Sequence, residues 1–248
     1  MVDYSTLEVH PATVKLFSKL YRRLGRLKYG ALYRKAFGQP VILTDGETSL
    51  VSYYRDGKLD YQAYKAVQQA GNAHKINLVS ASESALAELA RELLQTGFRP
   101  EFILCHGTRN GAEQRFFKAS FPGCCIVGTE ISDTATQFPD TIQWDFHEVK
   151  PEWVGKVDLL YSNSWDHSYD PKKLFAAWGS CISPDGIMAI EHTVGHLPEK
   201  RAVLDPFGAT VQGLVRVVEE NSRLRLHRIF ENSDKTKERK FVLFKSPN

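Results

Sequence analysis

Apolar and polar positions follow two different periods along most of this chain. From residue 80 onward, short apolar runs of strand length come one after another, and segments with apolar residues at helical spacing lie between most of them. Such runs begin at Phe102, Cys125, Thr141, Val157 and Gly186. Strands that alternate with helices are typical of a mostly parallel sheet with helices on both faces. We therefore predict an α/β fold of the doubly wound kind.

The last two apolar runs break this alternation. Arg223–Phe230 and Lys240–Lys245 are separated only by the charged segment Glu231–Glu238, which is too short for a crossover helix. Two strands that are joined so closely must be antiparallel. The sequence thus predicts a seven-stranded sheet that is mostly parallel and ends in an antiparallel C-terminal hairpin.

The pattern before residue 80 begins as a helix. In residues 1–37 apolar residues recur every three or four positions, which predicts a helix or a helix pair with Gly25 and Gly30 as possible breaks. Two short strands around Asp45–Gly46 and a helix that ends at Gly71 are expected next.

We expect two parts in the chain. Residues 1–79 form a basic appendage of helices and a hairpin, which covers the acceptor side as a lid, and residues 80–248 form the main domain. The appendage carries no cue for a nucleotide site, whereas the main domain carries the alternating strands and helices.

Charge is distributed unevenly, although the net charge of the chain is only +3. No acidic residue lies between Glu8 and Asp45, and this interval holds the cations Lys15, Lys19, Arg22, Arg23, Arg26, Lys28, Arg34 and Lys35. The predicted helix thus has a basic polar face, which is either a solvated surface or a site of attraction for something anionic. An anionic, phosphorylated or lipid-linked substrate and peripheral membrane contact through residues 10–37 are the favoured candidates. No RNA-recognition or helix-turn-helix signature accompanies the charge, so we expect no nucleic-acid partner.

Composition is that of an ordinary globular protein. The 248 residues are 42% hydrophobic and 25% charged, and the longest apolar runs are far too short for a transmembrane segment. Met1–Tyr4 does not open a signal peptide. The four cysteines form no CxxC pair, which favours buried reduced thiols and a cytoplasmic location.

A strand that runs into a glycine-containing turn and then into a helix organises the second part of the chain. Phe102–Cys105 is followed by the turn Gly107–Gly111 and by a helix-compatible segment. Open α/β sheets hold ligands in this arrangement, at the carboxyl end of a strand. A dinucleotide fingerprint requires a glycine where Arg109 stands, and a P-loop requires Gly-Lys-Ser/Thr where Ala112–Gln114 stands. NAD is therefore disfavoured, and a nucleoside triphosphate more strongly so.

The same turn resembles the cofactor loop of the class I S-adenosylmethionine-dependent methyltransferases, in which an acid and alternate glycines follow the first strand. Gly107 and Gly111 match the first and last glycines, whereas Cys105 replaces the acid and Arg109 the middle glycine. The resemblance implies that the loop binds the cofactor through His106, Gly107, Thr108, Arg109 and Gly111. We hypothesise that Arg109 pairs with the methionine carboxylate of the cofactor, because its planar fork suits a carboxylate.

Further positions match the same family. Glu130, at the end of the second predicted strand, is placed to accept hydrogen bonds from both ribose hydroxyls, a position that NAD-binding folds share. The resemblance places Asp145 at the adenine amino group and Phe146 on the adenine face, and it extends the cofactor site to Ile131 and Asn163. It covers residues 80–248 and implies a Rossmann-like methyltransferase fold with S-adenosylmethionine as cofactor.

The candidate catalytic residues lie after the strand that begins at Val157. His167 is a candidate general base because an imidazole titrates near neutral pH, and Asp166 or Asp170 could orient it. The alternative is that His167 only caps the following helix. A second possibility is a divalent-metal site in which Glu191–His192 and His196 join Asp166 and His167, but the spacing matches no metal motif, so we predict no metal.

These observations favour a methyltransferase that transfers the methyl group of S-adenosylmethionine to an oxygen of a small-molecule or glycan-type acceptor. Two alternatives stay open: an NAD-linked oxidoreductase or epimerase, and a protein of the same fold that binds without catalysis.

Overall fold

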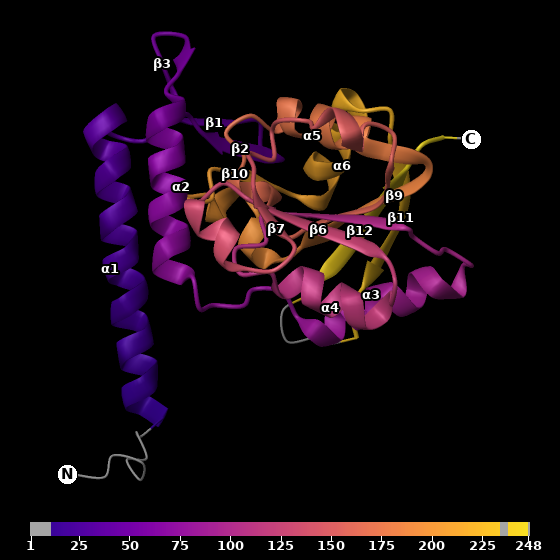
Figure 1. The fold of residues 1–248 in the computed structure, drawn as a ribbon. Coiled ribbons are helices and arrows are strands. Elements are labelled where there is room, and N and C mark those ends of the chain that lie inside the picture. Colours follow the sequence, from indigo (N-terminus) through magenta and orange to yellow (C-terminus); the bar gives the residue numbers. More distant parts are fainter. Residues whose placement is uncertain (1–10, 234–237, 248) are drawn as a thin grey trace, which may run out of the picture.

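A seven-stranded sheet forms the centre of the protein, which is described here by a computed structural model that covers residues 11–233 and 238–247 (Figure 1). The strand order is β11-β12-β9-β8-β5-β6-β7. The strands are β5 (Phe102–His106), β6 (Cys125–Glu130), β7 (Thr141–Gln143), β8 (Val157–Ser162), β9 (Ile182–His192), β11 (Arg225–Glu231) and β12 (Lys240–Lys245). Strands β5 to β9 pair in parallel, and β12 is antiparallel to both β9 and β11. The predicted mostly parallel sheet with an antiparallel C-terminal hairpin is confirmed.

Helices cover both faces of this sheet. Ile103 and Cys105 of β5 point toward α3 (Glu83–Gln95) and α4 (Ala112–Ser120), and Leu104 points toward α5 (Pro171–Cys181) and α6 (Val211–Asn221). Successive residues of a strand face opposite sides, so a strand that is covered on both sides reads as a continuous apolar run. The connections also contain short 3-10 turns, η1 (Asp133–Gln137), η2 (Pro151–Trp153), η3 (Trp165–His167), η4 (Val194–His196) and η5 (Pro198–Lys200).

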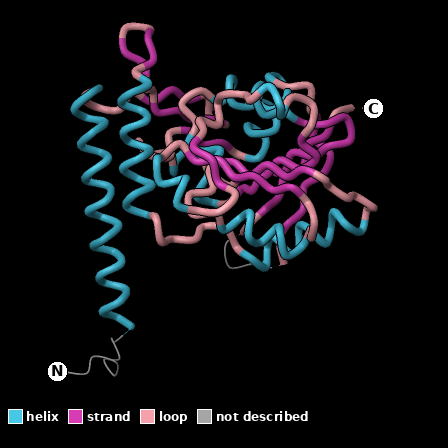
Figure 2. The backbone as a smooth tube through the Cα atoms, in the orientation of Figure 1, coloured by secondary structure: helices cyan, strands magenta, loops and turns pink. Residues whose placement is uncertain are grey.

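The N-terminal part consists of two packed helices and short strands. Helix α1 (Pro11–Phe37) lies outside α2 (Tyr61–Lys75), and α2 lies next to the body of the protein (Figures 1 and 2). Strands β1 (Ile42–Thr44) and β2 (Thr48–Val51) form a small sheet with β10 (Phe207–Ala209), and β3 (Tyr54–Arg55) and β4 (Lys58–Leu59) form a hairpin. This part is therefore connected by hydrogen bonds to the C-terminal third of the chain. No helix among the described residues is long and apolar enough to span a membrane.

Three glycines were wrongly predicted as helix breaks. Helix α1 continues through Gly25 and Gly30, and α2 continues past Gly71 to Lys75. A Cβ atom at Gly25 would lie 2.2 Å from the His74 ring, and one at Gly71 would lie 2.3 Å from Leu204. These two glycines allow close approach of neighbouring elements, which outweighs the weak helix propensity of glycine.

Candidate functional site

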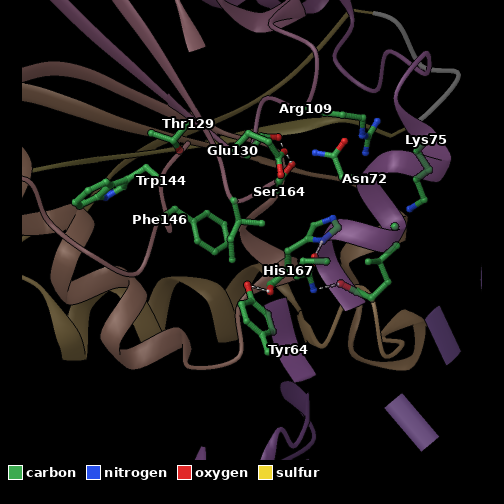
Figure 3. A pocket seen from close by; sticks show the side chains of 15 residues that line it. Tyr64, Asn72, Lys75, Arg109, Thr129, Glu130, Trp144, Phe146, Ser164 and His167 are labelled. Atoms are coloured by element: carbon green, nitrogen blue, oxygen red, sulfur yellow. Dashed lines mark hydrogen bonds between the residues drawn. The ribbon is translucent and has the colours of Figure 1, made fainter. Parts of the chain in front are cut away.

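A pocket lies at the carboxyl ends of β5, β6, β7 and β8, and α2 forms its opposite wall (Figure 3). The space that atoms leave free in it is about 520 Å³, including solvent at the open mouth. Its walls come from the loops after these strands and from one face of α2. Open α/β sheets bind ligands at this edge.

The turn after β5 brings backbone close to the pocket. Gly107 has φ +74°, and a Cβ atom there would lie 2.6 Å from the Cβ of Ser164. The amides of Gly107 and Thr108 both donate to the Thr129 carbonyl, at 2.9 and 3.0 Å, which ties the turn to β6. Only glycine combines a left-handed backbone with so close a neighbour. The predicted first glycine of the loop is thus fixed by its surroundings.

Glu130 ends β6 with its carboxylate at the pocket, facing Asn72 of α2 (Figure 3). The residue is 8% exposed, and one carboxylate oxygen accepts the Ser132 amide at 3.0 Å. Burial raises the pKa of Glu130, and the Ser132 amide and the Asn72 side chain oppose this shift. Among the described residues, the buried amide group of Asn72 has no partner that satisfies hydrogen-bond geometry. A buried polar pair of this kind is suited to a ligand with hydroxyl groups.

The segment after β7 places aromatic rings, and not a carboxylate, at the pocket. Trp144 and Phe146 line it. Asp145 instead accepts hydrogen bonds from the backbone amide of His147, at 2.9 Å, and pairs with the Nδ1 of the same residue at 2.8 Å. Burial acts to raise the pKa of Asp145, but the interactions with His147 and Tyr61 lower it below its ordinary value. Among the described residues, its other oxygen is buried and has no partner that satisfies hydrogen-bond geometry.

His167 lies in η3, directly after β8, and contacts α2 through Gln68. Gln68 donates its Nε2 to the Leu204 carbonyl at 2.8 Å, so its Oε1 faces Nδ1 of His167, also at 2.8 Å. Nδ1 therefore carries a proton, and Nε2 lies 3.2 Å from the Asp205 carboxylate. Burial lowers the pKa of His167, while Asp166 and Asp205 act to raise it. The neutral imidazole at neutral pH thus has its free lone pair on Nε2.

Asp166, His167 and Asp205 form the one group of potential metal ligands found among the described residues, with ligand atoms within 4.8 Å of one another. Two carboxylates and an imidazole could hold a divalent cation. Burial raises the pKa of Asp166 to about 7. Its nearest basic partner is His196, whose Nε2 lies 3.9 Å from the carboxylate.

The second predicted constellation is not brought together as a metal site. Glu191 forms a buried ion pair with Arg239 at 2.8 Å and accepts the Tyr161 hydroxyl at 2.7 Å. His192 contacts the Ala209 carbonyl through Nε2, and His196 Nδ1 accepts the Thr193 amide. These side chains are already satisfied by protein partners, so they serve packing at the end of β9.

The structure divides the predicted cofactor-binding residues into two groups. Those that line the pocket are Gly107, Arg109, Glu130, Ile131 and Phe146, and His167 joins them. Those outside the lining are His106, Thr108, Gly111, Asp145 and Asn163. His106 shows why: its ring stacks on Trp178, with centroids 4.9 Å apart, and burial lowers its pKa to about 3. The Arg109 guanidinium donates to the Leu78 carbonyl at 3.0 Å and to Ser80 at 3.3 Å.

The sequence did not reveal that α2 forms a wall of the pocket. The α2 residues that line the pocket are Tyr64, Gln68, Gly71, Asn72 and Lys75. The sequence also did not indicate Ser164 and Leu204 in the lining, or Asp205 beside His167. The α2 residues recur at intervals of three and four, so they share one face of the helix. A helix face that mixes small, polar and aromatic residues at this spacing is the pattern in the sequence that could have indicated a wall of a pocket.

Glu113, in the first turn of α4, provides a test of the electrostatics beside the pocket. It is 5% exposed, its Oε2 lacks a partner among the described residues, and burial raises its pKa to about 7. A carboxyl group with a raised folded-state pKa favours folding most below its unfolded-state value and loses that contribution as pH rises through about 7. We expect Glu113→Gln to stabilise the protein by about 3 kcal/mol more at about pH 8 than at about pH 4. Urea unfolding at both pH values measures this.

The exposed Glu199 offers a matched control for that experiment. Glu199→Gln should leave the free energy of unfolding nearly unchanged at both pH values. A stability difference between the Glu113 variant and the wild type that does not depend on pH would contradict the assignment.

No protein-family model and no curated protein matches this chain. Solved structures do resemble it. One is the 1,6-didemethyltoxoflavin-N1-methyltransferase of Burkholderia thailandensis, bound to its acceptor and S-adenosylhomocysteine (12% identity, TM-score 0.58, 85% of this chain and 100% of that chain). Another is the mitomycin 7-O-methyltransferase (13% identity, TM-score 0.57, 92% of this chain and 68% of that chain). A third is the geranyl diphosphate C-methyltransferase of Streptomyces coelicolor, in complex with Mg²⁺, geranyl diphosphate and S-adenosylhomocysteine (15% identity, TM-score 0.51, 70% of this chain and 82% of that chain).

These likenesses show the fold. The chain has a Rossmann-like methyltransferase fold, as predicted, and the structures that it resembles are those of S-adenosylmethionine-dependent methyltransferases. Their acceptors differ, and they are methylated on nitrogen, oxygen and carbon according to the names of these enzymes.

Proposed function

We propose that this protein binds S-adenosylmethionine and transfers its methyl group to an oxygen of a small-molecule or glycan-type acceptor. The observation that carries the proposal is the buried Glu130 carboxylate, which faces the pocket at the end of the second parallel strand, beside the Gly107 turn. The fold agrees, and two of the similar enzymes were crystallised with S-adenosylhomocysteine, the demethylated form of the cofactor.

The residues of the pocket fit this cofactor. Glu130 would accept the ribose hydroxyls, and the unpartnered amide of Asn72 would contribute from the opposite wall. Ile131 and Phe146 supply the apolar surface that an adenine requires. Gly107 lines the pocket, and its turn would lie beside the methionine part. When bound, S-adenosylmethionine supplies an electrophilic methyl group on a sulfonium.

His167 is the residue that would remove the proton from the acceptor hydroxyl. Gln68 holds the proton of the free imidazole on Nδ1, so Nε2 is the atom that accepts the acceptor proton. The imidazolium that forms then lies 3.2 Å from the Asp205 carboxylate, which stabilises it. The acceptor O–H bond would break as the oxygen takes the methyl group, and the carbon–sulfur bond of the cofactor would break with it to leave S-adenosylhomocysteine. The α2 wall of the pocket would shield the reacting groups from water.

Calorimetric titration with S-adenosylmethionine, S-adenosylhomocysteine and NAD tests the proposal. We expect the first two to bind at one site per chain and NAD not to bind, because Arg109 stands where a dinucleotide loop needs a glycine. Binding of NAD alone would establish the oxidoreductase alternative. Absence of binding for all three would favour a non-catalytic protein. We expect binding and activity to persist with a chelator, because the proton transfer assigned to His167 requires no metal ion.

A further inference from the structure

Helix α1 packs against α2 through an aromatic inner face. The Tyr21 ring stacks on His74, with centroids 3.9 Å apart, and its hydroxyl donates to the His74 carbonyl. Tyr29 and Tyr33 are buried, and the Tyr33 hydroxyl donates to the Ser52 carbonyl at 2.6 Å. One side of α1 is therefore held firmly against the protein.

The opposite side of α1 carries an exposed apolar stripe. Leu20, Leu24 and Leu27 are 51%, 54% and 55% exposed, and the exposed Ala31 continues their line. Each residue of a helix turns by about 100°, so these positions share one narrow face, on the far side of the helix from the buried Tyr29 and Tyr33. In Figures 1 and 2, α1 is the outermost helix on its side of the protein, and no other described element covers it there. The leucines thus meet solvent and not the core.

Exposed cations border this stripe along both of its edges. At the same helical spacing, Arg23 and Arg34 fall on one side of the leucines, and Lys28 and Lys35 fall on the other. No acidic residue occurs between Glu8 and Asp45 to offset them. A leucine stripe between two rows of cations is the pattern of a helix that lies in the plane of a membrane interface.

We propose that the outer face of α1 docks on an anionic lipid bilayer. The leucines would enter the boundary of the acyl chains, and the long Arg and Lys side chains would reach the headgroups. A second copy of the chain is a poorer occupant, because it would bring like-charged rows together. Nucleic acid would pair with the cations but leave the leucines in water.

Vesicle flotation of the full chain tests this proposal. We expect binding to vesicles of phosphatidylcholine and phosphatidylglycerol, weak or no binding to phosphatidylcholine alone, and release as salt rises. Arg23→Gln with Lys28→Gln should weaken binding about 25-fold, since each cation near such a surface contributes about fivefold. Leu24→Ser with Leu27→Ser should weaken it at least about tenfold.

The controls distinguish an effect of the α1 face from an effect of net charge and from a loss of folding. Arg91→Gln with Lys172→Gln removes the same charge at exposed positions on other helices and should leave binding within about twofold. Circular dichroism should be unchanged in all variants, because the replaced side chains are exposed. Three results would overturn the proposal: a wild-type chain that stays free of anionic vesicles, a dimer that the leucine variant dissociates, or an RNA that binds more tightly than the vesicles.

Discussion

Replacing His167 by alanine is expected to lower kcat by about 10² to 10⁴-fold, the usual contribution of a positioned general base. The affinity for S-adenosylmethionine should change little by comparison, because Glu130 and Asn72 are assigned to the ribose and His167 to the acceptor. Single-turnover methyl transfer and calorimetry on the same preparations measure the two quantities. The expected result is a separation of chemistry from cofactor binding.

The pH profile distinguishes a base from a residue that only shapes the pocket. Burial lowers the pKa of His167, so kcat should rise with pH along a limb below the ordinary value for histidine. Asp205 acts to raise this pKa, and Asp205→Asn should therefore move the limb to lower pH. A His167→Ala enzyme that retains wild-type kcat would show that the acceptor loses its proton unaided.

Glu130→Gln is expected to weaken the binding of S-adenosylmethionine about a hundredfold, since hydrogen bonds to a charged acceptor contribute about 1.5–3 kcal/mol each. The glutamine keeps the shape of the side chain and loses its charge. Because burial raises the pKa of Glu130, wild-type affinity should fall with decreasing pH earlier than for an exposed carboxylate. The variant should lose this pH dependence.

Glu199→Gln serves as the control for the affinity measurement, because this side chain is exposed and does not line the pocket. It should bind S-adenosylmethionine as the wild type does. Should Glu130→Gln bind equally well at every pH, the ribose hydroxyls are held elsewhere and the assignment of the pocket is wrong.

The fold was predictable because its signals are local. Strand β8 reads as an apolar run covered on both sides, and the short link before β12 requires an antiparallel pair whatever the rest of the chain does. Glu130 could be found for the same reason, since the end of a strand can be located from its pattern.

The site was only partly predictable because its contacts join distant parts of the chain. Asn72 faces Glu130, and Gln68 contacts His167, only because α2 packs across the strand ends. Asp205 lies in an irregular segment that has no period to place it. The contact of Asp145 is local, because its partner His147 is only two residues away. The Asp-x-His spacing therefore indicated that the carboxylate is already hydrogen-bonded.

Helix α2 is shared by the pocket on one side and by the tyrosines of α1 on the other. If a ligand that contacts Asn72 favours one position of α2, it also favours one position of α1, because α1 packs on α2. Binding of α1 to a surface would then change the affinity for the cofactor. By thermodynamic reciprocity, binding of the cofactor must change the affinity of the protein for that surface by the same factor. Measuring S-adenosylmethionine affinity with and without anionic vesicles would give this coupling free energy directly.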